Sequence, residues 1–198
     1  MKTVPLRLRY DSQRDPSFPR DLMGSSRCKT LTQCIQCGTC SGICPLSAYM
    51  DFTPRRVINL ARAGFKRDAL SCNTIWLCAS CYACAVECPK KVNITDIMYS
   101  LKRLAIREGL YPKGFPIPVL AREFSRMVRS RGRATESRLV LSLYLKTNIL
   151  KLLGMWRVGL KLFTRGRFSL RSEKIERINE LQRVLATATA EAGEGPIP

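Results

Sequence analysis

Cysteine is the residue of this chain best suited to chemistry, because histidine is absent. The 198 residues include 10 cysteines and no histidine, which excludes every scheme that needs an imidazole base or an imidazole metal ligand. Two stretches repeat the spacing Cys-x-x-Cys-x-x-Cys-x-x-x-Cys-Pro, and they supply Cys34, Cys37, Cys40 and Cys44, then Cys78, Cys81, Cys84 and Cys88. Runs of this type hold iron–sulfur clusters.

In two-cluster ferredoxins, three cysteines of a run wrap one [4Fe–4S] cluster and the fourth ligates the other cluster. Carried onto this sequence, the first cluster uses Cys34, Cys37, Cys40 and Cys88. The second uses Cys78, Cys81, Cys84 and Cys44. A pair of zinc knots is the disfavoured alternative, since zinc ribbons separate their Cys-x-x-Cys pairs. With four cysteines on each cluster, no iron stays open to substrate, so we expect two [4Fe–4S] clusters that relay electrons and no catalytic residue.

Two cysteines, Cys28 and Cys72, fall outside the runs. They are either ligands of an extra site or redox thiols, or else ordinary small core or surface residues, and we favour the second interpretation. Trp76 lies two residues before Cys78, and we expect its ring to shield the second cluster from water.

Each cysteine run is expected to lead into one amphipathic helix. After the first run, Thr53 is a good N-cap, Pro54 suits the first helical position, and Gly64 suits the C-terminal stop. After the second run, Thr95 is the expected cap and Gly109 the expected stop, with apolar residues at helical spacing between them. These two helices, each directly after a cysteine run, are therefore the elements expected to position the cysteine loops.

The remaining sequence suggests four parts. They are an N-terminal arm at 1–27, a dicluster domain at 28–111, a basic helical region at 112–190 and a disordered tail at 191–198. A weak alternation at 3–9 could form a short edge strand.

Helical periodicity predicts three helical stretches in the basic region. They cover residues 119–130, 137–163 and 173–189, after a proline-rich linker.

The N-terminus has no apolar run of signal-peptide length. No stretch of about 20 apolar residues exists either, so we expect no membrane span. Cysteines in a chain without an export signal are more often metal-bound than disulfide-bonded. We therefore expect a cytoplasmic protein.

The C-terminal half carries most of the net charge of +19. Residues 112–171 contain 14 Lys or Arg against two acids, a net +12. This pattern favours docking to an acidic, partly apolar partner subunit. An anionic membrane surface is possible but not favoured, and a solvated face is the remaining alternative. Nucleic-acid binding is not expected, because no recognition motif accompanies the charge.

The context of the second run resembles a known family. The residues are Thr-Ile-Trp-Leu-Cys-Ala-Ser-Cys-Tyr-Ala-Cys at 74–84, Val-Asn-Ile-Thr-Asp-Ile at 92–97 and Leu-Lys-Arg-Leu-Ala at 101–105. Over residues 30–112 the chain resembles the C subunits of heterodisulfide reductases and their bacterial homologues. The resemblance implies an all-α structure, an α-helical ferredoxin fold with a helical C-terminal extension.

The same resemblance implies a place in a complex. The expected function is an iron–sulfur electron-transfer subunit of a heterodisulfide-reductase-like oxidoreductase. It would relay electrons between an A-like subunit, which carries flavin and iron–sulfur clusters, and a B-like subunit active on disulfides and thiols, in sulfur metabolism. The alternative is the iron–sulfur subunit of a membrane-associated, quinone-linked redox complex, and a nucleic-acid-binding iron–sulfur protein is a weaker third hypothesis.

Overall fold

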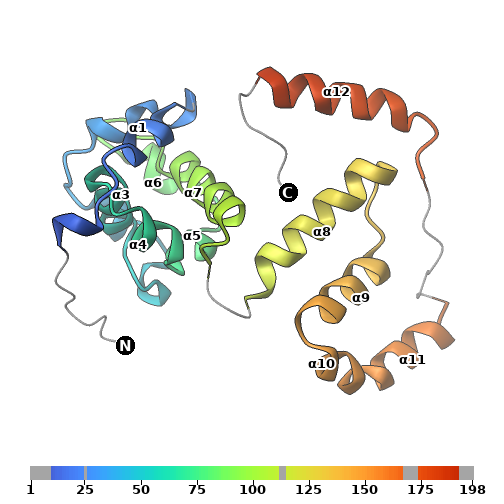
Figure 1. The fold of residues 1–198 in the computed structure, drawn as a ribbon. Helices are drawn as coiled ribbons and strands as arrows, with labels where there is room; N and C mark the ends of the chain where they lie inside the picture. Colours follow the sequence, from blue (N-terminus) through green and yellow to red (C-terminus); the bar gives the residue numbers. More distant parts are fainter. Residues whose placement is uncertain (1–9, 25, 112–114, 167–173, 192–198) are drawn as a thin grey trace. The chain divides into compact units, whose positions relative to one another are not determined.

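The structure, a computed structural model, describes residues 10–24, 26–111, 115–166 and 174–191 (Figure 1). Every regular element in these ranges is helical, which confirms the all-α class. The chain divides into two compact units, residues 1–112 and 113–198. The alternation expected to form a strand at 3–9 and the tail from 192 onward lie outside the described residues.

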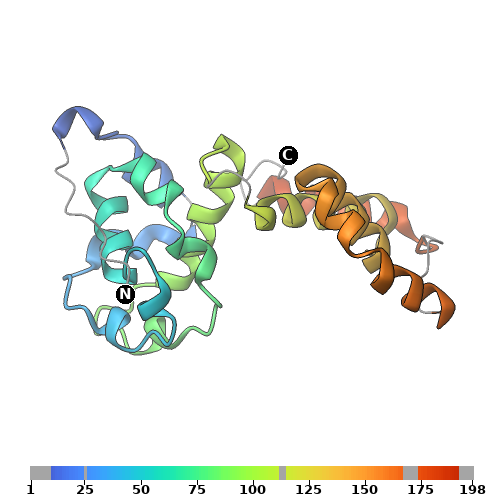
Figure 2. The ribbon, with the colours of Figure 1, turned by 90° about the horizontal axis from the view of Figure 1, so that it is seen from below.

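The first unit folds around three helices, α3 (Pro54–Ala63), α4 (Lys66–Ser71) and α7 (Ile94–Glu108), which pack against one another (Figures 1 and 2). Its other elements are short: η1 (Asp11–Gln13), α1 (Phe18–Met23), η2 (Ser26–Gln33), α2 (Thr39–Gly42), η3 (Ser47–Tyr49), α5 (Thr74–Leu77) and α6 (Ala83–Val86). Val57, Ile58, Leu70, Ile97 and Leu101 are fully buried between the long helices. This core carries the two cysteine runs on its connecting loops.

Helix α3 begins and ends where the sequence predicts. Thr53 is the extended N-cap, Pro54 is the first helical residue, and Gly64 ends the helix in the left-handed region at φ +83°. A Cβ at Gly64 would lie 2.7 Å from the carbonyl oxygen of Asp15. Glycine is therefore required both for the turn and for the close approach of the N-terminal segment.

Helix α7 begins two residues earlier than the expected cap at Thr95. Asn93 is the N-cap and Ile94 the first helical residue, while Gly109 ends the helix at φ +68° as predicted. The prediction for Thr95 is wrong because its side chain is buried in the first turn, with Oγ1 3.7 Å from the Sγ of Cys84. Packing against the second cysteine loop thus outweighs its capping preference.

The second unit contains five helices in the part described. They are α8 (Pro116–Arg131), α9 (Glu136–Thr147), α10 (Ile149–Gly154), α11 (Trp156–Thr164) and α12 (Ile178–Glu191). Helix α8 starts earlier than predicted because Pro116 takes the first helical position. The predicted stretch 137–163 breaks at Asn148, whose side chain accepts hydrogen bonds from the N–H groups of Leu150 and Lys151 at 3.1 and 3.2 Å.

A buried acid joins α8 to α9. Glu123 is 4% exposed, and its carboxylate accepts hydrogen bonds from Lys146 Nζ at 2.5 Å, from Ser142 Oγ at 2.6 Å and from Arg126. Burial opposes ionisation of Glu123, but these three donors outweigh it and lower its pKa to about 2. By contrast, every side chain from 136 to 164 remains at least partly exposed.

None of the helices in the described ranges combines the length and the apolar character that a membrane crossing requires.

Candidate iron–sulfur site

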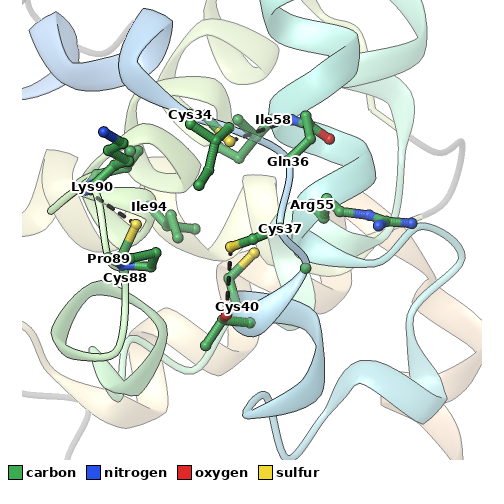
Figure 3. Close-up of a pocket in the computed structure, with 14 residues that line it drawn as sticks. Cys34, Gln36, Cys37, Cys40, Arg55, Ile58, Cys88, Pro89, Lys90 and Ile94 are labelled. Carbon is green, nitrogen blue, oxygen red and sulfur yellow. Dashed lines mark hydrogen bonds between the residues drawn. The ribbon is translucent and has the colours of Figure 1, made fainter.

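The eight cysteines of the two runs line two cavities. The first has an empty volume of about 360 Å³, part of it open to solvent, and is lined by Cys34, Cys37, Cys40 and Cys88 (Figure 3). The second has an empty volume of about 680 Å³, also partly open, and is lined by Cys44, Cys78, Cys81 and Cys84. Each cavity thus receives three cysteines from one run and the last cysteine of the other, the same division that the sequence predicts for the cluster ligands.

The two loops repeat one backbone shape as well as one spacing. In the first, Gln36 and Gly38 are left-handed, with φ of 59° and 92°; in the second, Ser80 and Tyr82 occupy the same positions, each with φ of 60°. A short helix follows in each loop, α2 and α6, and these two helices pack together. Left-handed non-glycine residues are uncommon and strained, so the three present here indicate that the surrounding fold imposes this shape.

The last cysteine of each run lines the cavity of the other run, because the chain turns away after the first three cysteines. Cys88 approaches the first cavity from the opposite side to the loop at 34–40 (Figure 3). The backbone N–H of Val92 donates to Cys88 Sγ at 3.4 Å. Ile94, which begins α7, lines both cavities and therefore lies between them.

Hydrogen-bond donors surround several of the sulfur atoms. Gln36 Nε2 donates to Cys34 Sγ at 3.3 Å, and the Thr39 hydroxyl lies 3.4 Å from Cys37 Sγ. The hydrogen bond with Thr39 lowers the pKa of Cys37. Donors of this kind stabilise thiolates and tune the groups that thiolates bind.

Burial raises the pKa of the third cysteine of each run, Cys40 and Cys84. The neighbouring cysteines raise both pKa values further. For Cys84 those neighbours include Cys78, Cys81 and Cys44. Several thiolates held together repel one another, so binding of a positively charged iron centre would relieve this cost and is linked to loss of their protons.

The two cavities differ in their other walls. Arg55 and Lys90 line the first cavity (Figure 3). The second is walled by apolar side chains, among them Leu46, Met50 and Met98. The cysteine spacing does not predict this contrast, because Arg55 and Met98 lie in the helices that follow each run.

Trp76 does not have the role expected of it. Its ring is buried against Tyr111, with centroids 6.4 Å apart and an edge-to-face angle of 80°. It is not among the described residues that line the second cavity, whose apolar wall is made by Met50 and Met98. Proximity in sequence to Cys78 was misleading, because α5 directs Trp76 toward the end of α7; the helical spacing of Met98 with Ile94 and Leu101 was the better indication.

Cys28 and Cys72 are core residues, in agreement with the favoured interpretation. Both are buried, and among the residues described around the cavities neither appears. Cys28 Sγ donates to Ser100 Oγ and Cys72 Sγ to the carbonyl oxygen of Ala69, each at 3.2 Å. Burial raises the pKa of the Cys72 thiol to about 12, so it stays protonated and unreactive.

The donor set of each cavity fits an iron–sulfur cluster. A cubane offers four separate iron corners, so its four thiolates ring a cavity. Four cysteines line each cavity, and thiolates are among the ligands that bind iron–sulfur clusters.

Comparison with known proteins places this arrangement in a class. Residues 30–92 match the model of the 4Fe-4S dicluster domain family. This part of the chain is therefore similar to dicluster iron–sulfur domains, and its all-helical structure fits a ferredoxin-like iron–sulfur fold.

The similar proteins are C subunits of heterodisulfide reductases. The chain is 42% identical over 76 residues to the C subunit of the ferredoxin:CoB-CoM heterodisulfide reductase of Methanosarcina mazei, covering 38% of this chain and 47% of the relative. It is 38% identical over 80 residues to the C subunit of the H(2):CoB-CoM heterodisulfide,ferredoxin reductase of Methanothermobacter marburgensis, covering 40% and 43%. Its dicluster domain is thus related to heterodisulfide reductase C subunits, and the chain spans about half the length of the curated relatives it matches.

Proposed function

We propose that this chain is the iron–sulfur electron-transfer subunit of a heterodisulfide-reductase-like complex. In this proposal Cys34, Cys37, Cys40 and Cys88 hold one [4Fe–4S] cluster, and Cys44, Cys78, Cys81 and Cys84 hold the other. The observation that carries it is the division of the eight cysteines between two cavities in these crossed sets.

The residues around the cavities suit this task. When bound, the two clusters would supply groups that accept and release single electrons. Cys44 and Cys88 each line the cavity of the other run. The two cavities must therefore lie next to each other, with Ile94 between them. Cys37 and Cys81, the second cysteines of each run, are exposed, so each site has an edge at the surface of the domain where a redox partner can approach.

The relatives are named as C subunits, which supports a place in a complex with other subunits. We propose an A-like flavoprotein subunit and a B-like subunit active on disulfides or thiols, in the cytoplasm and in sulfur metabolism. In this arrangement the basic region at 112–190 contributes to docking. A membrane-associated, quinone-linked redox complex remains the second candidate, and the observation that favours it is the exposed amphipathic helix α11.

Anaerobic purification of the chain from its own promoter tests the proposal. We expect a flavoprotein to co-purify, and EPR during reductive titration to show two magnetically interacting [4Fe–4S] signals. Preparations that are fully folded but hold zinc, or only one cluster, would reject the two-cluster assignment. Co-purification with a quinone-reactive membrane protein instead would favour the second candidate.

A further inference from the structure

Helix α11 presents two distinct exposed faces. Trp156, Leu160 and Phe163 are spaced i, i+4, i+7, so they share one face of the helix, and they are 63%, 55% and 65% exposed. Arg157 and Lys161 share the neighbouring face and are also exposed. Large apolar side chains left together in water indicate a surface that another body covers.

The neighbouring helix α10 also carries exposed apolar side chains. Helix α10 packs against α11, and its Leu150 and Leu153 are 74% and 64% exposed. These residues together with Trp156, Leu160 and Phe163 are called the apolar surface of α10–α11 below. Its two aromatic residues distinguish it from the scattered exposed leucines that any protein surface carries.

The charge around this surface has one sign. The described stretch 149–166 contains four Lys or Arg and no Asp or Glu. A second copy of the chain is therefore a poor occupant, because it would bring four more cations against these four. The complementary occupant must be both apolar and uniformly anionic.

We infer that α10–α11 binds the surface of a membrane that contains anionic lipids. Helices with Trp, Phe and Leu on one face and Lys or Arg on the other lie in the plane of the membrane interface. The apolar face enters the headgroup and acyl boundary, while Arg157 and Lys161 contact lipid phosphates. Protein interfaces are depleted in lysine at their centres, so the lysines at 151 and 161 favour lipid over an acidic protein groove. Binding at the surface needs no membrane-crossing helix.

Vesicle flotation of the intact, anaerobically purified chain tests this inference. We expect it to float with phosphatidylcholine vesicles that contain phosphatidylglycerol and to remain in solution with pure phosphatidylcholine. Binding should weaken with salt, since the Debye length falls from about 10 Å at 0.1 M to about 3 Å at 1 M. Trp156 emission should shift to the blue on binding, whereas Trp76, which is already buried, should not respond.

Substitutions separate the two contributions. Trp156→Ala and Phe163→Ala should each lower the affinity for anionic vesicles about ten-fold, because each removes an aromatic side chain that the membrane would bury. Arg157→Gln and Lys161→Gln should each lower it about five-fold and reduce the salt dependence. Val86→Ser, at a valine 79% exposed in the first unit, and Arg183→Gln, at an exposed cation of α12, are matched controls that should bind like the unaltered chain.

Three results would overturn the inference. The first is that the chain does not float with anionic vesicles at low salt. The second is that the Arg157→Gln and Lys161→Gln variants float as well as the unaltered chain. The third is that a co-purifying protein shields Trp156 from iodide when no lipid is present. Circular dichroism and iron content of each variant show whether it is folded. The inference does not rest on the proposed function, because lipid binding and iron content are measured separately in the same samples.

Discussion

The carboxylate of Asp51 accepts hydrogen bonds from the backbone N–H groups of Asn73 and Thr74, both at 2.8 Å, and from the Thr74 hydroxyl at 2.5 Å. Asp51 follows the first cysteine run, whereas the fully buried Thr74 begins α5, the helix that leads directly to Cys78. This contact therefore fixes the start of the second run against the end of the first.

Removal of this acceptor should destabilise the first unit. Asp51→Ala leaves two N–H groups without their acceptor, and we expect the free energy of unfolding to fall by about 2 kcal/mol. Thr74→Val keeps the shape but loses the hydroxyl and should cost about 1 kcal/mol. Anaerobic denaturant unfolding measures both. Asp11→Ala is the control, because that side chain is 93% exposed and its ion pair with Arg14 should contribute less than about 0.5 kcal/mol; equal losses at Asp11 and Asp51 would contradict the argument.

Pairs of serine substitutions test the crossed ligand sets. Cys34→Ser with Cys88→Ser removes two proposed ligands of the same cluster, so about half of the iron and the EPR signal of one cluster should remain. Cys34→Ser with Cys44→Ser removes one ligand from each cluster, and almost all iron should be lost.

The opposite pattern of iron contents would show that each run holds its own cluster. Cys28→Ala is the control for a cysteine outside both cavities, and its iron content should equal that of the unaltered chain.

The cations beside the first cavity should raise the reduction potential of the cluster proposed there. Arg55→Gln or Lys90→Gln removes a positive charge, and the potential of that cluster should fall by an amount on the order of tens of millivolts. The other cluster should change less, since its cavity is walled by Leu46, Met50 and Met98. EPR-monitored redox titration measures both, with Arg20→Gln, at an exposed cation of α1, as the control. Equal shifts in both clusters would show that net charge acts without regard to position.

The lowered pKa of Glu123 makes the second unit sensitive to acid. The ionised form stabilises the fold above about pH 4.5, and this contribution is lost as the pH falls toward the folded-state pKa of about 2. Its full size is roughly 3 kcal/mol. The protection factors of amide hydrogen exchange in α8 and α9, taken relative to the intrinsic exchange rate at each pH, should therefore fall across this range.

Glu123→Gln should remove most of that pH dependence and weaken protection at neutral pH. Glu180→Gln is the matched control, because the Glu180 side chain is 63% exposed and pairs only at 3.4 Å with Arg177. If Glu123→Gln exchanges like the unaltered chain at neutral pH, the carboxylate does not hold α8 to α9.

Local sequence determined the features that depend on a few neighbouring residues. The helix α3 from Pro54 to the left-handed Gly64, and the end of α7 at Gly109, follow from backbone preferences within one turn. The two cysteine spacings likewise predict which side chains share a cavity, because a short loop can present three thiolates only to one volume.

Tertiary structure decided the features that depend on contacts far apart in the chain. Thr95 turns inward toward Cys84 instead of capping α7, and Met98 replaces Trp76 as the wall of the second cavity, because burial of a helix face outweighs local propensity. The basic and apolar pattern of the C-terminal region already favoured a docking surface in the sequence. The structure of the second unit decided which apolar side chains remain exposed there, Trp156 and Phe163 among them.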